Sequence, residues 1–326
     1  MKPGTGVPAI RRYSWQNAPG AVRDIRQKVF VEEQQVPVAL EWDDTDAIAD
    51  HYLTTTDGDR PIAVARLYPS VTETAQIGRM AVLPEYRGQG YGRQLLRHMV
   101  ADAAGDFEDI YLSAQEQAIR FYEQSGFHVC SSPYDDAGIP HVDMRCLAPA
   151  MVAGQLEHKA WPMIYGRDPE AWFCEDERSL RDLTDSVAGQ ARQRLWLYDR
   201  LLSHDLYDRF RLREILSAIA RRHRLSDVRL LVHDDGPLVK RRHQLVELMR
   251  RLPSSMELRL ISPDHPREEQ PFMIADREAL VYRHRFDKPE GFAKFAAPGH
   301  VRRLQQGFQR MWDAASPSPE LRQLPL

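Results

Sequence analysis

A glycine-rich turn between an apolar strand and a helix constrains this chain more than any other feature. Gly88, Gly90 and Gly92 alternate with larger residues, and they follow an apolar run, Ile77–Val82, that is typical of a short strand. Glycine lets the backbone bend tightly and bring several N–H groups close to an anion. A helix expected over residues 93–104 would add the positive end of its dipole at the same point. The pattern predicts a cradle for a phosphate group.

Two common nucleotide-binding motifs do not fit this turn. A P-loop ends in Gly-Lys-Ser/Thr, whereas Gly92 is followed by Arg93 and Gln94. A dinucleotide fold needs the wider Gly-x-Gly-x-x-Gly spacing and an acidic residue after a second strand, and the chain has neither at this place. The alternatives that remain are another kind of phosphate cradle and an ordinary turn whose glycines only cap the helix.

A second segment continues the alternation of strand and helix. We expect a strand over residues 110–114, followed by a helix over 117–124 that ends at Gly126. Another strand is expected over residues 127–130. Within this segment the run Phe121–Phe127 reads Phe-Tyr-Glu-Gln-Ser-Gly-Phe.

Together the two segments resemble the GNAT N-acetyltransferases. The acetyl-CoA signature of that family is Gln/Arg-x-x-Gly-x-Gly/Ala, and Arg87, Gly90 and Gly92 occupy its defined places. The run Phe121–Phe127 matches the family's Phe-Tyr-x-x-x-Gly-Phe residue for residue. Because the two motifs are independent and correctly spaced, the resemblance favours a cofactor site over an ordinary turn.

Further segments are similar to the ElaA-like branch of the family. They are residues 26–34, Asp43, Asp46 and residues 134–141. The resemblance as a whole covers residues 10–147. It implies a GNAT fold for residues 1–148, which is an α+β domain with a central mixed sheet.

The rest of the chain is predicted to be a second α/β domain. Small residues around Pro149 suit a linker, so we expect domains over residues 1–148 and 149–326. The expected elements are strands at 195–198, 228–232 and 257–261, helices at 206–222 and 238–252, and a hairpin of residues 272–276 and 279–282. Such alternation predicts βαβ units and a mostly parallel sheet.

The order of these elements resembles one lobe of the phospholipase D-like fold. The chemistry of that family needs His-x-Lys-x-x-x-x-Asp. If Asp276 is the aspartate of the motif, Glu269 and Pro271 stand where the histidine and lysine should be. The resemblance therefore implies a catalytically inactive lobe that serves in binding, homodimer formation or support of the first domain. An unrelated α/β domain is the alternative.

Length, cysteines and apolar runs limit the class of protein. At 326 residues the chain is too long for one such module. Its three cysteines are odd in number and lack metal-ligand spacing, which predicts reduced thiols rather than a disulfide framework or a zinc site. No run approaches the roughly 20 apolar residues that span a bilayer. We expect a cytoplasmic protein with no membrane segment and no metal.

Charge is distributed unevenly between the two halves. Residues 1–148 contain 14 Lys and Arg against 21 Asp and Glu, whereas the remainder contains 30 against 26. An acidic catalytic half would favour a cationic acceptor such as an amine, although a solvated acidic surface explains it equally well. The arginine pairs of the second half alternate with acids, which favours a solvated face over a nucleic-acid surface.

The GNAT resemblance assigns the acetyl-CoA site to two runs. It implies that the backbone of Met80, Ala81 and Val82 aligns the pantetheine arm like an added strand, and that an N–H there stabilises the oxyanion. The pyrophosphate would bind the turn and its flanking residues, which are Arg87, Gly88, Gln89, Gly90, Tyr91, Gly92 and Arg93.

The same resemblance suggests residues for proton transfer. Tyr122 stands where the family has the tyrosine beside the CoA sulfur, and it is the expected acid. Glu33 and His141 both lie in ElaA-like segments, so each is a candidate base for the amine, and each has a structural alternative. Asp43 and Asp46 would either bind a cationic acceptor or cap a helix, and capping is favoured.

Three functions are compatible with these residues. The leading one is an acetyl-CoA-dependent N-acyltransferase that moves an acetyl group to a small-molecule or peptide amine by direct attack in a ternary complex. The others are a non-catalytic acyl-CoA sensor and a nucleic-acid or phosphate binder led by the second half. A sensor has no need of an acid, so Tyr122 beside a complete cradle favours the enzyme.

Overall fold

The chain divides into two compact units, Met1–Pro162 and Met163–Leu326, and each is described by itself. The computed structural model describes all residues except 1–7, 72, 156–159, 263–267 and 323–326. Helix α5 (Pro149–Ala153) follows the predicted domain boundary and packs in the first unit, against α3 (Tyr91–Ala103). The domain limits stay a prediction, because compactness does not show which residues fold independently.

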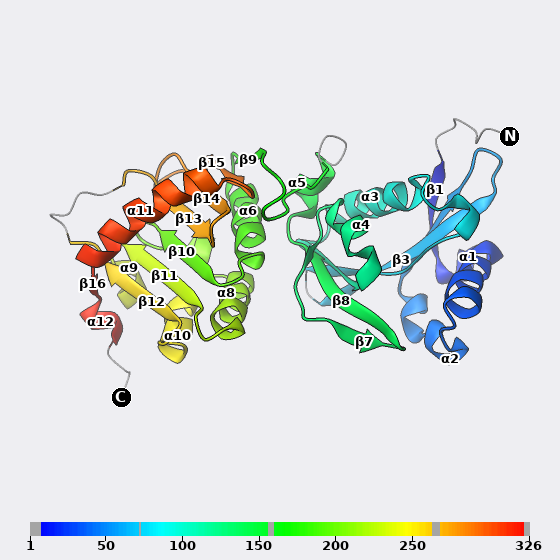
Figure 1. The fold of residues 1–326 in the computed structure, drawn as a ribbon, viewed down its shortest axis with the longest axis horizontal. Coiled ribbons are helices and arrows are strands. Elements are labelled where there is room, and N and C mark those ends of the chain that lie inside the picture. The colour runs from blue at the N-terminus through cyan, green and yellow to red at the C-terminus, as the bar shows by residue number, and fades with distance from the viewer. Residues whose placement is uncertain (1–7, 72, 156–159, 263–267, 323–326) are drawn as a thin grey trace. The chain divides into compact units, whose positions relative to one another are not determined.

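The first unit is built on one mixed sheet. Its strand order is β1-β2-β3-β4-β5-β8-β6, with β7 paired to β8 (Figure 1). The strands are β1 Ala9–Ser14, β2 Asp50–Thr55, β3 Pro61–Val71, β4 Thr74–Val82, β5 Asp109–Gln115, β6 His128–Val129, β7 Tyr134–Asp136 and β8 Ile139–Cys146. Only β4 and β5 are parallel, and the other neighbouring pairs in the described residues are antiparallel.

Helices cover the two faces of this sheet. The helical elements are α1 Gly20–Arg26, a π-helix Gln27–Glu33, α2 Val38–Glu41, α4 Ile119–Glu123, and 3-10 turns at Trp15–Asn17, Asp44–Ala47, Pro84–Tyr86 and Glu116–Ala118. Helix α1 buries Val22 and Ile25 against Val64 of β3. Helix α3 buries an apolar face that includes Leu96 and Met99. Figure 1 shows α1 and α3 on opposite sides of β3. The turn before α3 lies at the carboxyl end of β4, which is an interior strand of the sheet.

The elements that the sequence predicted in the first unit, between residues 77 and 130, are all present, with some differences in length. Helix α3 begins at Tyr91, two residues before the predicted start, and β5 is the predicted strand over 110–114 with one more residue at each end. The helix expected over 117–124 was too long, because a 3-10 turn precedes the short α4. The strand expected over 127–130 is reduced to β6.

The second unit also has one sheet, but the prediction that it is mostly parallel was wrong. Its order is β16-β12-β11-β10-β13-β14-β15-β9. The strands are β9 Ala171–Cys174, β10 Arg194–Tyr198, β11 Asp227–Val232, β12 Met256–Leu260, β13 Phe272–Ala275, β14 Ala279–Arg283, β15 Gly291–Lys294 and β16 Ser316–Pro317. Among the described strands, only β10–β11 and β11–β12 pair in parallel. Helical crossovers join those three strands, whereas β13, β14 and β15 follow one another as an antiparallel meander.

Two predicted helices of this unit are each broken in two. The helices are α6 Glu177–Gly189, α7 His204–Tyr207, α8 Phe210–Arg222, α9 Gly236–Lys240, α10 Gln244–Arg251, α11 Pro298–Ala314 and α12 Pro319–Arg322. Asp208 lies in the first break, where its carboxylate accepts from the backbone N–H of Gln244, 2.8 Å away. His243 lies in the second break and caps α10 through its ring. The hydrogen bond between Asp208 and Gln244 therefore joins the two breaks. Such a contact between distant residues cannot be read from the local sequence.

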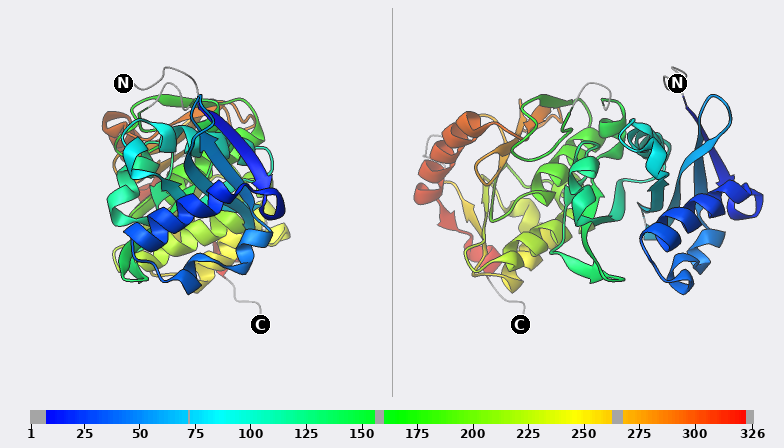
Figure 2. Two further views of the ribbon diagram at one scale, coloured as in Figure 1. Left: turned by 90° about the vertical axis from the view of Figure 1, so that its right-hand side faces the viewer. Right: turned by 45° about the vertical axis from the view of Figure 1, so that its right-hand side comes forward.

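Aromatic residues form the core between this sheet and α11. Trp196 of β10 stacks on Phe308 of α11, with ring centroids 4.9 Å apart, and Phe308 stacks on Trp312. Figure 2 (right) shows α11 on one face of the sheet and α6 and α8 on the other. Trp172, Trp196 and Trp312 are buried in this unit, whereas Trp161 belongs to the first unit and is half-buried.

Asp276 has a structural role in this unit. Its carboxylate accepts hydrogen bonds from the backbone N–H groups of Arg192, Gln193 and Arg194, at 2.7, 3.0 and 2.7 Å. It therefore fixes the segment that enters β10. The phospholipase D-like resemblance stays a prediction.

Candidate functional site

The glycine-rich turn needs its glycines for two different reasons. Gly88 and Gly90 have φ angles of +74° and +89°, in the left-handed region that side chains disfavour. A Cβ on Gly92 would lie 3.2 Å from Val82 Cγ2 and 3.5 Å from Phe121 Cζ, so this position is limited by packing. The turn leads directly into α3, whose N-cap is Gly90. The predicted cradle is thus a strand–turn–helix with exposed backbone at the helix N-terminus.

The two arginines beside the turn bind protein groups in this structure. Arg87 donates to both carboxylate oxygens of Glu33, at 2.6 and 2.7 Å, and its Nε donates to the Val82 carbonyl at 2.9 Å. The hydrogen bond from Arg87 lowers the pKa of Glu33. Arg93 donates to the side-chain oxygen of Gln124 at 2.6 Å. A predicted phosphate ligand and a predicted base are therefore paired with each other.

Strand β4 has an irregular backbone just before the turn. Val64 lies opposite Ala81 and Arg66 opposite Gly78, so Arg79 and Met80 together face one residue of β3. This is a β-bulge, and Arg79 has a φ of +51°. On the other side, the pairing of β4 with β5 ends at Ile77 in the described residues. The backbone of residues 80–82 thus forms an edge to which an extended ligand could pair.

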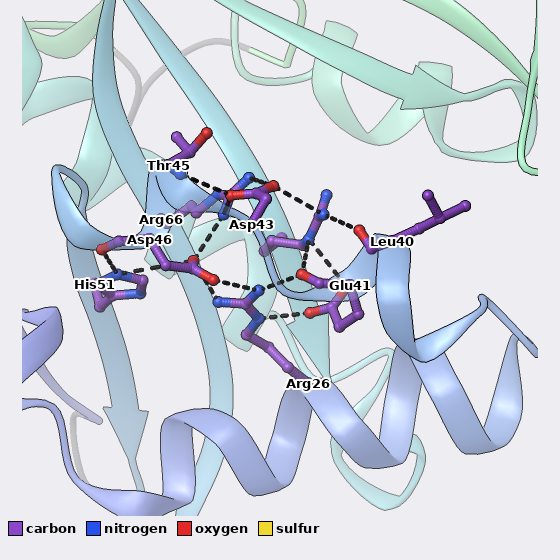
Figure 3. Close-up of polar contacts among 9 residues, drawn as sticks. Arg26, Leu40, Glu41, Asp43, Thr45, Asp46, His51 and Arg66 are labelled. Atoms are coloured by element: carbon purple, nitrogen blue, oxygen red, sulfur yellow. Dashed lines mark hydrogen bonds and ion pairs between the residues drawn. The ribbon is translucent and has the colours of Figure 1, made fainter.

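A buried network of charges lies beside the bulge (Figure 3). Arg26, which is 1% exposed, donates to Glu41 at 2.5 Å and to Asp46 at 2.7 and 3.1 Å. Arg66 donates to Asp46 and twice to Asp43, each at 2.7 Å. Each carboxylate therefore lies against at least one guanidinium.

The network also holds the bulge in place. Arg79 donates to the Leu40 carbonyl at 2.7 Å and to Asp43 at 3.2 Å, and its Nε lies 2.9 Å from Glu41. Asp43 accepts from the backbone N–H of Thr45 and so caps a 3-10 turn, which confirms the capping role expected for it. Helix α2 and this turn thereby fix the backbone next to Met80.

Opposing effects set the pKa values within the network. Burial acts to raise the pKa of Asp43, but hydrogen bonds and charge from Arg66, with help from Arg79, lower it to about 2. For Glu41 burial prevails, and its pKa is raised despite Arg26 and Arg79. The mutual pairing of these groups indicates a structural role rather than an acceptor site.

Tyr122 brings the two sequence motifs together. Its hydroxyl lies 3.9 Å from the sulfur of Met80, at the bulge. Its ring makes edge contacts with Phe121 and Phe127, at centroid distances of 5.0 and 6.1 Å. Burial raises the pKa of Tyr122 to about 12, so the hydroxyl stays protonated at neutral pH. The ring of Tyr122 therefore packs against Phe121 and Phe127, and its hydroxyl lies beside β4.

His141 is oriented by its neighbours on the β7–β8 hairpin. Its Nδ1 lies 2.8 Å from the Ile139 carbonyl, and its ring stacks on Tyr134 at 6.2 Å. Because a carbonyl oxygen only accepts, Nδ1 carries the proton and Nε2 holds the lone pair of the neutral imidazole. Nε2 has no partner within the described residues. The geometry presents one basic nitrogen in a fixed direction.

Three polar residues that the sequence reasoning did not single out, Ser113, Gln115 and Asp143, lie on the paired strands β5 and β8 near His141. Gln115 lies opposite His141 in the sheet and donates to Gln34 at 3.0 Å. Tyr134 donates to Asp143 at 2.7 Å, and its hydroxyl is 2.5 Å from that of Ser113. These residues could have been found from the two-residue period of strands β5 and β8. That period places Ser113, Gln115, His141 and Asp143 on one face of the sheet.

No group of three or more His, Cys, Asp or Glu side chains in the part of the chain that the structure describes is arranged to hold a metal ion. None of the helices in those same residues is both long enough and apolar enough to cross a membrane.

Comparison with known families gives a different result for each half. Residues 23–148 match the family described as "Acetyltransferase (GNAT) domain". Residues 176–324 match a family described only as "Domain of unknown function (DUF7931)".

Individual relatives match somewhat more than a third of the chain. A protein of Schizosaccharomyces pombe, "UPF0039 protein C11D3.02c", is 37% identical over 124 residues, which are 37% of this chain and 82% of the relative. The "Uncharacterized N-acetyltransferase YjcF" of Bacillus subtilis is 34% identical over 122 residues, 37% of this chain and 86% of the relative. "Protein ElaA" of Escherichia coli is 33% identical over 129 residues, 38% of this chain and 84% of the relative. The crystal structure of ElaA has a TM-score of 0.39 and 27% identity, and it covers 43% of this chain and 99% of ElaA.

Proposed function

The chain belongs to the GNAT acetyltransferase family, and we propose that its first unit moves an acetyl group from acetyl-CoA to an amine of a small molecule or peptide. The observation that carries this proposal is the convergence of two separate motifs. The Tyr122 hydroxyl lies 3.9 Å from the sulfur of Met80. Met80 belongs to the segment of β4 that no longer pairs with β5 in the described residues and that leads into the glycine-rich turn. A cofactor edge and a hydrogen-bond donor for the departing sulfur thus lie together, as acyl transfer from a thioester requires.

Backbone groups are proposed to hold the cosubstrate. The residues of the turn, 87–93, would bind the pyrophosphate through N–H groups at the N-terminus of α3. The edge formed by Met80, Ala81 and Val82 would pair with the pantetheine arm. An N–H at this edge would stabilise negative charge on the carbonyl oxygen, and such preorganised donors contribute roughly 3 to 4 kcal/mol.

Tyr122 is proposed to assist the departing sulfur. A thiol has an ordinary pKa near 8.5. With its pKa raised to about 12, Tyr122 donates a hydrogen bond to a thiolate more readily than it gives up its proton. We therefore assign it a hydrogen bond to the leaving sulfur, with the final proton coming from solvent or from the base.

Of the two candidate bases, we favour His141 over Glu33. Both oxygens of Glu33 accept from Arg87, which lowers the pKa of this carboxyl and makes it a weaker base. His141 keeps Nε2 basic because Nδ1 donates to Ile139. In this assignment Glu33 positions Arg87 and does not take the proton.

For the second unit we propose a lobe without phosphodiesterase chemistry. Glu269 and Pro271 stand at the places of the motif's histidine and lysine, and Asp276 is engaged by three backbone N–H groups. No nucleophile is left there to form a phosphoenzyme. The whole chain is proposed to act in the cytoplasm.

Titration of the purified chain with CoA, followed by calorimetry, tests the cradle. Gly90→Val should lose binding, because a side chain at φ +89° strains the backbone and would crowd a bound phosphate. Gly166→Val is the matched control, since Gly166 has a φ of +72° and open space but lies in the second unit. Absence of CoA binding at millimolar concentration would refute the cofactor, and equal binding by Gly90→Val would refute the cradle.

Release of CoA from acetyl-CoA in the presence of a panel of amines tests the chemistry. His141→Gln should lower kcat by roughly 10²-fold to 10⁴-fold, as expected for a lost base. Tyr122→Phe removes one hydrogen bond to the leaving sulfur and should lower kcat by roughly 10²-fold to 10³-fold. Both variants should leave CoA affinity nearly unchanged. Tyr13→Phe, at a tyrosine that packs on the α1 side of the sheet, is the control. If Glu33→Gln lowers kcat more than His141→Gln does, the assignment of the base is reversed. A chain that binds CoA but releases none with any amine supports the acyl-CoA sensor instead.

A further inference from the structure

The second unit contains a cavity that neither motif predicted. Its volume is about 510 Å³, within the range of small-molecule sites. It is lined by Arg200, His233, Asp234, Glu268, Glu269 and Phe286. Arg200 follows shortly after β10, and His233 and Asp234 follow directly after β11.

The sheet topology explains why a cavity lies at this edge. Strands β10 and β11 are parallel neighbours, so their carboxyl ends meet at one edge. The strand on the other side of β10 is β13, which is antiparallel and is reached only after β12. The order of strands therefore reverses next to β10. Open α/β sheets commonly bind ligands at the carboxyl ends of strands at such a point.

Hydrogen bonds fix the floor of the cavity. The hydroxyl of Tyr198 lies 2.7 Å from the Glu268 carbonyl and 2.6 Å from Nε2 of His233. The carbonyl only accepts, so the hydroxyl donates to it and His233 donates to the hydroxyl. The ring of Phe286 makes edge contacts with His233 and Tyr198, at 5.3 and 5.8 Å.

A buried ion pair supports the wall behind Phe286. Arg283 donates to Asp199 at 2.5 Å, and both side chains are less than a tenth exposed. Another nitrogen of Arg283 donates to the Phe286 carbonyl at 3.4 Å. The aromatic wall is therefore held in place before any ligand arrives, which reduces the entropy lost on binding.

The charges at the rim are of both signs and do not pair with each other. The side chain of Arg200 is exposed and makes no hydrogen bond or ion pair with any described residue. The same is true of the Glu269 carboxylate. Among the described residues, the Asp234 carboxylate accepts only from the backbone N–H of Gly236. The Glu268 carboxylate packs beside Gly307 of α11. One guanidinium and three carboxylates thus line the same cavity, and Arg200, Asp234 and Glu269 keep capacity to bind a ligand.

We propose that this cavity binds a zwitterionic amino acid with an apolar side chain. The ligand carboxylate would bind the Arg200 guanidinium, which suits it geometrically. Its ammonium group would lie against Asp234 and Glu269, and its side chain would pack on Phe286. An anion alone or an amine alone would leave one sign of rim charge without a partner. This inference does not depend on acetyl transfer.

Calorimetric titration of the full chain with amino acids, without CoA, tests the ligand class. L-phenylalanine and L-leucine should bind, and glycine should bind more weakly because it does not reach Phe286. N-acetyl-L-phenylalanine and L-phenylalanine amide each lack one charge. Each should bind at least about 10-fold more weakly than L-phenylalanine. The proposal would be overturned if no amino acid bound at 10 mM. It would also be overturned if both blocked forms bound as tightly as L-phenylalanine itself.

Variants locate the site on the chain. Arg200→Gln and Glu269→Gln should each weaken L-phenylalanine binding about 10-fold to 100-fold, as expected for a lost charged hydrogen bond. Arg302→Gln is the matched control, because Arg302 is exposed on α11 and does not line the cavity. If Arg200→Gln and Glu269→Gln both bind L-phenylalanine as the wild type does, the ligand lies elsewhere and the proposal is overturned. The same conclusion follows if His141→Gln abolishes the binding instead.

Discussion

Arginines and carboxylates meet in two regions of this molecule, with opposite results. In the first unit, Arg26 is 1% exposed and donates to Glu41 and Asp46 from all three of its side-chain nitrogens. It also lies 4.6 Å from the ring centre of Trp42. In the second unit, Arg200 is exposed and pairs with no described residue, although Asp234 and Glu269 line the same cavity.

The difference follows from the cost of removing charge from water. A buried ion must be paired and hydrogen-bonded, because leaving it alone costs several kcal/mol. In the first unit the buried arginines and carboxylates therefore bind one another and leave no group for a ligand. They stabilise the fold, including the bulge of β4. Exposed charges around a cavity keep their hydration and cost little while unpaired. They remain able to bind a ligand.

The largest effect on stability is expected at the buried network. Arg26→Gln leaves Glu41 and Asp46 without their main partner, so the free energy of unfolding should fall by about 3 to 5 kcal/mol. Urea unfolding followed by circular dichroism measures this. The matched control is Arg12→Gln, because Arg12 pairs with Asp50 at side-chain exposures of 55% and 48% and should change stability by less than about 1 kcal/mol. Equal losses in the two variants would contradict the comparison.

A smaller effect, dependent on pH, is expected at Asp43. Its carboxyl is 36% exposed, so Asp43→Asn should cost only about 1 kcal/mol at neutral pH. The pKa of Asp43 is about 2 in the folded chain, below its value of roughly 3.9 when unfolded. The stabilisation is therefore fully present above about pH 4 and is lost as the pH falls toward 2.

Unfolding of the wild type and Asp43→Asn over this range checks the sign of the pH effect. The difference in unfolding free energy between the two chains should be constant above about pH 4 and should shrink below it. A difference that instead grows as the pH falls would show that Asp43 is not stabilised as an anion by Arg66 and Arg79.

The smallest effect on stability is expected at the cavity. Arg200→Gln removes an exposed guanidinium that pairs with no described residue, so the free energy of unfolding should change by less than about 0.5 kcal/mol. The same urea experiment measures it. A loss comparable with that of Arg26→Gln would mean that Arg200 supports the fold, and the contrast between the two regions would fail.

Much of the first unit could be predicted because its signals are local. Glycines at positions that need a positive φ marked the turn, and Gly88 and Gly90 have that conformation. The two-residue and helical periods located β5 and α3 to within one or two residues. The second unit lacked such signals, and its sheet was predicted with the wrong balance of parallel and antiparallel pairs.

Pairing between distant side chains could not be predicted in the same way. Glu33 and Arg87 were assigned to different roles, yet they bind each other across 54 positions of sequence. The network around Arg26 depends on α2 and the capped turn folding back onto β3 and β4. Hydrophobic periodicity in the sequence does not reveal such contacts, because they form only when separate elements pack together.

By itself, the sequence indicated the acetyltransferase family, the glycine turn, the order of strands and helices between residues 77 and 130, and the candidates Tyr122 and His141. Those properties depend on residue type and on spacing of a few positions, which backbone conformation converts directly into local structure. Only the tertiary structure decided which nitrogen of His141 is basic, that Glu33 is tied to Arg87, and that a cavity with unpaired charges lies after β10 and β11. These depend on which groups lose water together, and that is settled only when the chain has folded.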